Sequence, residues 1–132
     1  MTTLADTSAW IEYLRATGSP THLRLRRLIA DEGAVVTTEV VVVELLAGAS
    51  NDDELSRLGR LLGRFELLPV QGLADYEAAA GLYRRCRRAG ETVRKLTDCL
   101  IAVVAMRAGA ALLHRDQDFD VIARHAPLLV AG

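Results

Sequence analysis

The segment TDCLIAVVAMRAGAALLHRDQDFD, residues 97–120, is the most informative part of the sequence about the fold. Residues 98–107 form a strongly apolar helical pattern that ends at a glycine, and residues 110–113 form a short apolar run typical of a buried strand. The acidic residues Asp116 and Asp118 follow that strand closely. A helix, a buried strand and then polar residues in this order are typical of α/β proteins with a parallel sheet.

The rest of the chain repeats this alternation. Further strands are predicted at 2–5, 34–36 and 66–70, with an edge strand at 128–130. Further helices are predicted at 7–14, 21–30, 38–47, 52–62, 74–88 and 121–124. The predicted buried stripe of the fourth of these helices is Leu55, Leu58, Leu61 and Leu62. Together these elements predict an α/β sandwich around a mostly parallel sheet.

The length and composition indicate one ordinary folded domain. A chain of 132 residues can bury a substantial core, and we expect residues 1–132 to form a single domain. With 51% hydrophobic and 25% charged residues, the composition excludes a disordered or low-complexity chain. The formal net charge of −1 gives no overall attraction to nucleic acid or to an anionic membrane.

Cysteine usage and the amino-terminal residues predict a cytoplasmic location. Cys86 and Cys99 are too few for a disulfide scaffold, and they form no CxxC pair for zinc. Residues 1–6 contain neither a basic nor an apolar signal-peptide region. The most apolar runs, 40–43 and 100–106, are much shorter than the roughly 20 residues that span a bilayer, so we expect no membrane association.

Five acidic residues in or beside apolar segments are candidate site residues. Asp6 follows the first strand, Glu44 interrupts a run of valines and leucines, and Asp98 begins the apolar helix. Asp116 and Asp118 follow a buried strand. Ligands of a parallel sheet bind beyond the carboxyl ends of its strands, where Asp6, Asp116 and Asp118 are expected. Asp98 begins a helix, and helices of this fold begin at the same edge of the sheet. Glu44 lies one helical turn further from that edge, and its side chain is long enough to reach it.

The charge of such a cluster determines what it binds. Two carboxylates about 4 Å apart repel by roughly 4 kcal/mol at an effective dielectric constant near 20, so the cluster protonates or recruits cations. Carboxylate oxygens without His or Cys ligands select Mg²⁺ or Mn²⁺ rather than zinc. A carboxylate cage with open metal positions is an arrangement that splits phosphodiesters.

Each acid also has a structural interpretation. Asp6 could be a turn or cap residue, although the hydroxyls of the next two residues can also cap the following helix. Asp98 could be a favourable charge in a first helical turn, and Glu44 could pair with an arginine to offset its burial. Residues 116–118 could be an ordinary polar loop, and Asp120 is expected to be solvated.

Four segments together resemble the signature of a known family. They are DTSAW at 6–10, ELLAG at 44–48, TDCLIA at 97–102 and RDQDF at 115–119. In this order and spacing they are similar to the four signature segments of PIN-domain ribonucleases, and most of all to those of the VapC toxins of bacterial toxin–antitoxin pairs. The resemblance extends from Leu4 to about Ile122, nearly the whole chain.

The resemblance implies a three-layer α/β/α fold and an Mg²⁺- or Mn²⁺-dependent endoribonuclease. It also implies the toxin of a type II toxin–antitoxin system, a homodimer that a small VapB-type antitoxin inhibits. The residues that match the family's acidic quartet are Asp6, Glu44, Asp98 and Asp116. Asp118 matches an additional acid near the metal, and Asp6 and Asp98 lie where the family holds Mg²⁺ most directly. His114 departs from the family's usual Thr or Ser, and we interpret it as structural.

Basic residues are concentrated in one segment. Six of the 16 lie within twelve positions, and they are Arg84, Arg85, Arg87, Arg88, Arg94 and Lys95. The segment is either a solvated helix end that the helix dipole favours or a surface that contacts RNA phosphates beside the acidic pocket.

Two other function classes fit parts of the pattern. A catalytically silent PIN-fold module would bind RNA or a partner without cleavage, but loss of a quartet acid would be its sign and none is lost. A phospho-acceptor receiver domain needs an aspartate at the end of a central strand near mid-chain, whereas Asp52 and Asp53 begin a helix. We therefore predict an active metal-dependent nuclease.

Overall fold

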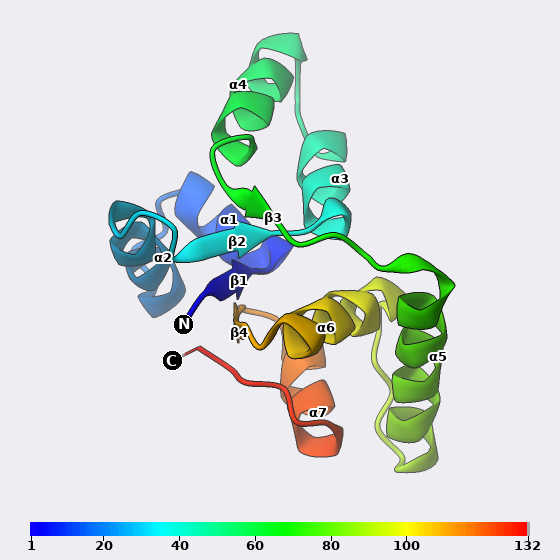
Figure 1. The fold of residues 1–132 in the computed structure, drawn as a ribbon. Coiled ribbons are helices and arrows are strands. Elements are labelled where there is room, and N and C mark those ends of the chain that lie inside the picture. The colour runs from blue at the N-terminus through cyan, green and yellow to red at the C-terminus, as the bar shows by residue number, and fades with distance from the viewer. Residues whose placement is uncertain (132) are drawn as a thin grey trace.

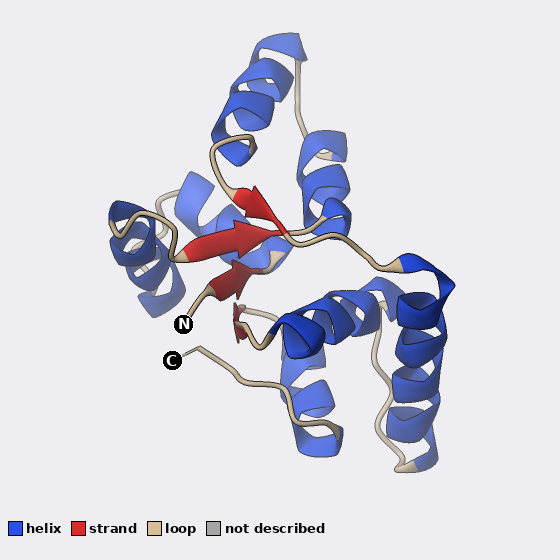
Figure 2. Cartoon of the chain, in the orientation of Figure 1, coloured by secondary structure: helices blue, strands red, loops and turns tan. Residues whose placement is uncertain are grey.

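The computed structural model describes residues 1–131. Within that range, seven helices pack around a four-stranded sheet (Figures 1 and 2). The strands are β1 (Thr3–Ala5), β2 (Val35–Thr37), β3 (Glu66–Leu67) and β4 (Ala111–Leu113). The helices are α1 (Thr7–Leu14), α2 (Pro20–Ala30), α3 (Glu39–Ala47), α4 (Asp52–Leu62), α5 (Gly72–Arg88), α6 (Leu96–Ala108) and α7 (Gln117–His125). The predicted alternation of strands and helices is confirmed.

The sheet is fully parallel, with the strand order β3-β2-β1-β4. In the register of this sheet, Leu4 of β1 pairs with Val36 of β2 and with Leu112 of β4. Right-handed crossovers place the helices between β1 and β3 on one face and the helices after β3 on the other. Accordingly, α1 packs against α2, while α5, α6 and α7 pack against one another (Figure 1). The predicted three-layer α/β/α fold is therefore confirmed.

Strands β1, β2 and β4 are buried at every position, as expected for a parallel sheet covered on both faces, whereas the edge strand β3 is exposed. Leu4 and Leu112 have no exposed surface, and Trp10 and Phe119 are the largest fully buried side chains. Helix α6 is buried at every position from Asp98 to Ala105 and contacts α5, α7 and β4. Because α6 is enclosed in this way, the acidic residue at its beginning is held on a rigid element.

Two strand predictions were too long. The strand predicted at 66–70 ends at Leu67, because Pro69 has no backbone N–H to continue the ladder. The predicted edge strand at 128–130 is reduced to a single parallel bridge between Val130 and Leu112.

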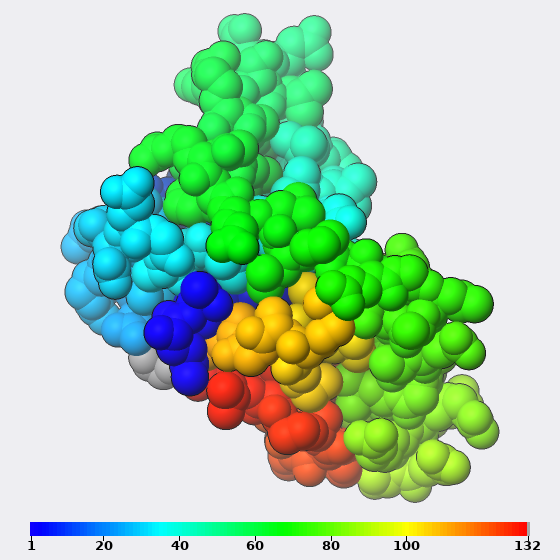
Figure 3. Space-filling model, viewed as in Figure 1, coloured from blue at the N-terminus to red at the C-terminus, as the bar shows by residue number. Residues whose placement is uncertain are grey.

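Two helix predictions also need correction. The last helix begins at Gln117 rather than at residue 121, because the Asp116 side chain caps it and draws the acidic loop into its first turn. In α4, Leu58 and Leu62 are buried as predicted, but Leu61 is only partly buried and Leu55 is 42% exposed. Helices α3 and α4 project from the rest of the molecule as a pair, which leaves one flank of α4 without a neighbour (Figures 1 and 3).

Several large apolar side chains remain on the surface, including Val43 of α3, Leu73 and Tyr76 of α5, and Leu96 of α6. No helix within residues 1–131 is long and apolar enough to cross a membrane. Exposed apolar groups that lie together are typical of protein–protein contact surfaces.

The core assignment predicts the effect of one truncation. Leu112→Ala should lower the free energy of unfolding by about 2–5 kcal/mol, because it leaves a cavity in the middle of the sheet. The matched control, Leu55→Ala, should lower it by less than about 1 kcal/mol. Urea denaturation of both variants measures the difference. Equal effects of the two substitutions would contradict this account of the core.

Candidate metal centre

Three helix amino-termini meet at the carboxyl ends of β1 and β4, and each contributes acidic residues. Asp6 is the N-cap of α1, directly after β1. Asp98 is the third residue of α6. Asp116 is the N-cap of α7 and Asp118 is its second residue. Unsatisfied N–H groups and the positive end of the helix dipole stabilise carboxylates at such positions.

The structure brings three of the predicted acids into one cluster. Asp98, Asp116 and Asp118 each offer a carboxylate oxygen, and these oxygens lie within 4.8 Å of one another. Asp6 and Glu44 lie outside that spacing, but both are linked to the cluster through hydrogen bonds or charge, as described below. We call these five residues the acidic site.

Asp118 is the most firmly held acid of the site. Its Oδ1 accepts the backbone N–H of Arg94 at 3.0 Å and its Oδ2 accepts that of Lys95 at 3.0 Å. The guanidinium Nε of Arg94 adds a third bond to Oδ1 at 3.2 Å. Although burial opposes it, these hydrogen bonds lower the pKa of Asp118. Asp118 is therefore an ionised and fixed carboxylate.

Asp98 has the opposite environment. Its side chain is 1% exposed, and neither carboxylate oxygen has a hydrogen-bond partner within residues 1–131. Burial, the neighbouring Asp118 carboxylate and the charge of Asp6 raise the pKa of Asp98 to about 8. A buried carboxylate without hydrogen bonds is costly, and its charged partner, Lys95, lies 3.8 Å away, so this side chain favours a closer cation or a proton.

Asp6 is both a cap and a candidate ligand. Its Oδ2 accepts the backbone N–H of Ser8 at 2.9 Å and the Ser8 hydroxyl at 2.5 Å. Its Oδ1 is buried and unpartnered in the part of the chain that the structure describes. Burial raises the pKa of Asp6, against the hydrogen bonds from Ser8. The capping interpretation of the sequence therefore accounts for only one of the two oxygens.

Glu44 is paired, but with a lysine rather than with an arginine. Its Oε1 accepts the Thr7 hydroxyl at 2.7 Å, and its Oε2 lies 3.4 Å from Lys95 Nζ. The ammonium of Lys95 also lies 3.8 Å from Asp98 Oδ1. Lys95 thus connects Glu44 to the acidic cluster.

The basic segment divides into two parts. Arg94 Nη2 lies 2.7 Å from Asp116 Oδ1, so Arg94 and Lys95 are ion-pair partners of the acidic site. The neighbouring carboxylates of Asp118 and Asp116 raise the pKa of Arg94. Against the effect of burial, Asp98, Glu44 and Asp6 raise the pKa of Lys95. The other four residues are exposed along the last turns of α5: Arg84, Arg85, Arg87 and Arg88.

Thr7 and Ser8 are site residues that the sequence indicated only as possible helix caps. Ser8 Oγ donates to Asp6 and accepts the backbone N–H of Arg115 at 2.9 Å, so it joins the loops after β1 and β4. The His114 side chain is 7% exposed, its ring lies 5.2 Å from that of Phe119 at a tilt of 47°, and its Nδ1 accepts the N–H of Asp116 at 3.1 Å. Its predicted structural role agrees with these contacts.

The acidic site fits a hard divalent cation. Within residues 1–131, three buried carboxylate oxygens have no hydrogen-bond partner, two on Asp98 and one on Asp6, and these are the donors that such an ion would satisfy. In the described part of the chain, the cluster of potential ligand atoms contains carboxylates alone and does not include the buried thiol of Cys99. An oxygen-only donor set of this kind favours Mg²⁺ or Mn²⁺.

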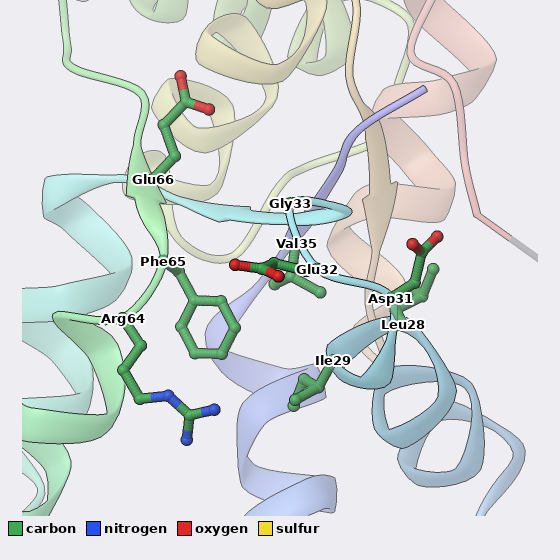
Figure 4. A pocket seen from close by; sticks show the side chains of 9 residues that line it. All are labelled: Leu28, Ile29, Asp31, Glu32, Gly33, Val35, Arg64, Phe65 and Glu66. Carbon is green, nitrogen blue, oxygen red and sulfur yellow. The ribbon is translucent and has the colours of Figure 1, made fainter.

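A separate hollow of about 300 Å³ lies at the amino ends of β2 and β3 (Figure 4). Figure 4 shows Phe65 and Arg64 on one side of it and Asp31 and Glu32 on the other, while Glu66 points away. None of the five acids lines this hollow, so it is distinct from the acidic site.

The parallel α/β fold with acids at the carboxyl edge of its sheet defines an α/β protein whose ligand site lies at that edge, and comparisons with known proteins identify its family. Residues 3–125 match the PIN domain. The chain is 50% identical over 130 residues to Ribonuclease VapC11 of Mycobacterium tuberculosis, and the aligned residues make up 98% of this chain and 97% of that protein. Ribonuclease VapC51 of the same species is 32% identical over 120 residues, 91% of this chain and 84% of that protein. The chain belongs to the PIN-domain family and, within it, to the VapC ribonucleases.

A solved structure supports the fold. The crystal structure of VapBC2 from Rickettsia felis, bound to a DNA fragment from their promoter, contains a chain that matches this one with a TM-score of 0.77 at 18% identity. The match covers 99% of this chain and 98% of that chain.

The loop that carries Arg94 and Lys95 is anchored by Glu91, whose pKa provides a test. Hydrogen bonds from Arg124 and His125 of α7 lower the pKa of Glu91 from its ordinary 4.5 to about 2. A lowered pKa stabilises the fold above the unfolded-state value and is lost as the pH falls toward 2. Glu91→Gln should therefore melt below wild type at pH 6, and the difference should shrink between pH 4.5 and pH 2.

The matched control is Glu77→Gln, an exposed glutamate of α5, which should follow the wild-type melting curve at each pH. A constant difference between Glu91→Gln and wild type across this pH range would contradict the anchoring role of Glu91.

Proposed function

We propose that the protein is the toxin of a type II toxin–antitoxin pair and that it hydrolyses RNA with Mg²⁺ or Mn²⁺ bound in the acidic site. The observation that carries this proposal is the buried carboxylate of Asp98, which has no hydrogen-bond partner among residues 1–131 and lies beside the carboxylates of Asp116 and Asp118. As a VapC ribonuclease, the protein is an RNA-cleaving hydrolase. The residues proposed to hold the ion are Asp6, Glu44, Asp98, Asp116 and Asp118.

The chain holds the carboxylates of the acidic site in fixed orientations. A divalent ion at this site lowers the pKa of water and neutralises charge on the phosphate. Asp118 cannot rotate, because three donors hold it. Ser8 donates a hydrogen bond to Oδ2 of Asp6, and Thr7 donates one to Oε1 of Glu44. The second carboxylate oxygen of each acid is not used by these hydrogen bonds. Rotamers fixed in this way reduce the reorganisation that binding of the ion and the phosphate would otherwise require.

The central test is the replacement of a single ligand. Asp98→Asn and Asp6→Asn are nearly isosteric, yet each removes one anionic oxygen ligand. Loss of an outer partner of a metal ligand already costs roughly 10- to 100-fold in activity, so loss of a ligand should lower RNA cleavage by more than about 100-fold. Without metal, both variants should melt at or above wild type because carboxylate repulsion is relieved. Mn²⁺ should raise the wild-type melting temperature more than theirs.

Asp120→Asn is the matched control, because Asp120 lies in the same helix, α7, but is 61% exposed. It should keep both the metal response and the cleavage rate. Purified Asp98→Asn that cleaves RNA at the wild-type rate would contradict the proposal, and so would an active enzyme that is indifferent to a chelator. A catalytically silent module would show no metal-dependent cleavage in wild type.

A VapB-type antitoxin is the proposed partner, and we infer that it masks the acidic site. A groove of about 290 Å³ opens between α1 and the α3–α4 pair. Ile11, Leu14 and Leu58 give it an apolar floor, and the charged residues Arg15, Glu44 and Glu54 also line it. An amphipathic segment of the antitoxin fits such a groove. From there an arginine can reach the acids, whose carboxylates suit its planar fork.

Leu14→Asp should therefore weaken binding of the antitoxin at least about tenfold while RNA cleavage stays at the wild-type rate, because Leu14 lines the groove but lies outside the acidic site. Isothermal titration and an RNA cleavage assay measure the two effects. A toxin–antitoxin complex with the acidic site open and metal-occupied would contradict the masking mechanism.

We also propose a homodimer. Leu73, Tyr76 and Ala80 follow one face of α5, and Tyr76 and Leu96 line one apolar hollow. This surface suits a second copy of the same chain, because a two-fold interface brings the same patch of both subunits together and an apolar patch can bury itself against its copy. Light scattering at micromolar concentration should give the dimer mass for wild type and the monomer mass for Tyr76→Asp. A stable wild-type monomer would overturn the proposal.

A further inference from the structure

Lys95 is an unusual residue in this chain. It is the one lysine among 16 basic residues, and the other 15 are arginines. An ammonium is a compact point charge, whereas a guanidinium is a planar, delocalised fork. The chain therefore places its single point-charge cation at the acidic site.

The position of Lys95 also breaks a local rule. Lys95 is the N-cap of α6, where a cation faces the positive end of the helix dipole, and among the described residues its side chain makes no capping hydrogen bond. The usual caps, Ser, Thr, Asp and Asn, are absent from that position. A local conflict of this kind is typical of a functional position.

The contacts of Lys95 leave it free to bind a further anion. Its Nζ lies 3.4 Å from Glu44 Oε2 and 3.8 Å from Asp98 Oδ1, and its side chain is 49% exposed. An ammonium has three donors, and these two contacts are long. Arg94 differs, because its Nη2 and Nε are engaged at 2.7 and 3.2 Å by Asp116 and Asp118.

Lys95 brings a permanent positive charge between two of the proposed ligands. Its Nζ lies 3.4 Å from Glu44 Oε2 and 3.8 Å from Asp98 Oδ1. A divalent ion bound by those same two oxygens would lie about 2.0–2.6 Å from each, in the space that the ammonium occupies. A second ion held by Glu44 and Asp98 would therefore have to displace the ammonium.

We propose that Lys95 is a built-in cation of the acidic site, which takes the place of a second divalent ion and binds the scissile phosphate of the RNA. This inference rests on the proposed function. The ammonium donates an N–H to a non-bridging phosphate oxygen and keeps its proton, so it contributes charge and position. Lys95 then has two opposed effects, since it repels the metal ion and attracts the phosphate.

The experiment compares wild type with Lys95→Gln, Lys95→Arg and the control Arg26→Gln, an exposed cation of α2 with the same charge change. Mn²⁺ binding to metal-free protein is measured by the electron paramagnetic resonance signal of free Mn²⁺, without RNA. Cleavage of a short fluorogenic RNA is then measured at saturating Mn²⁺. Circular dichroism of each variant verifies folding, and Lys95→Arg keeps the test valid if the glutamine variant fails to fold.

We expect wild type to bind one Mn²⁺ per chain. Lys95→Gln should bind that ion at least about tenfold more tightly, because charges of one sign a few ångströms apart repel even at the dielectric constant of water. The same variant should cleave RNA at least about tenfold more slowly. Lys95→Arg should bind Mn²⁺ like wild type and cleave at an intermediate rate, and Arg26→Gln should match wild type in both assays.

Two bound ions in wild type, unchanged Mn²⁺ affinity in Lys95→Gln, or cleavage by that variant that is unchanged or faster would each overturn the role of Lys95. Failure of the underlying proposal has a different signature. In that case wild type binds no Mn²⁺ and Asp98→Asn behaves like wild type.

Discussion

Repulsion between carboxylates at one edge of the sheet is the constraint on which the rest of the structure depends. Asp98, Asp116 and Asp118 present oxygens within 4.8 Å of one another, and the charge of Asp6 contributes to the raised pKa of Asp98. The amino-termini of α1, α6 and α7 oppose this repulsion with their N–H groups and dipoles. Arg94 and Lys95 oppose it with charge. The compensation is uneven, because Asp118 is fully paired while Asp98 has no hydrogen-bond partner among residues 1–131. That imbalance is the physical basis of the proposed cation site.

The fold delivers these groups through two elements. Helix α6 is enclosed by α5, α7 and β4, so Asp98 lies on the most deeply buried helix of the described chain. The loop between α5 and α6 brings Arg94 and Lys95 back to the site, with Glu91 bound to α7 and Val93 buried. The stability of that loop and the geometry of the acidic site are therefore coupled, because residues of one short segment serve both.

The sequence predicted what depends on local pattern. The alternation of elements, the parallel sheet and the placement of Asp6, Asp98 and Asp116 at strand ends and helix starts follow from periodicity and from the topology of α/β folds. Contacts between distant segments were not predictable. The ion pair of Glu44 with Lys95 spans 51 residues and the bond from Arg115 to Ser8 spans 107, and no periodic pattern encodes either. For the same reason Arg94 and Lys95 were grouped with the exposed arginines of α5, although they face the acids.

The most direct test of the account is a crystal structure of the protein soaked with Mn²⁺, with data collected for the anomalous signal of the ion. The account predicts one anomalous peak in each chain, in contact with carboxylate oxygens of Asp98 and of at least one of its acidic neighbours, with Lys95 beside it. An acidic site without a peak at millimolar Mn²⁺, with Arg94 and Lys95 still paired to the carboxylates, would contradict the central claim that these acids are held together to bind a metal ion.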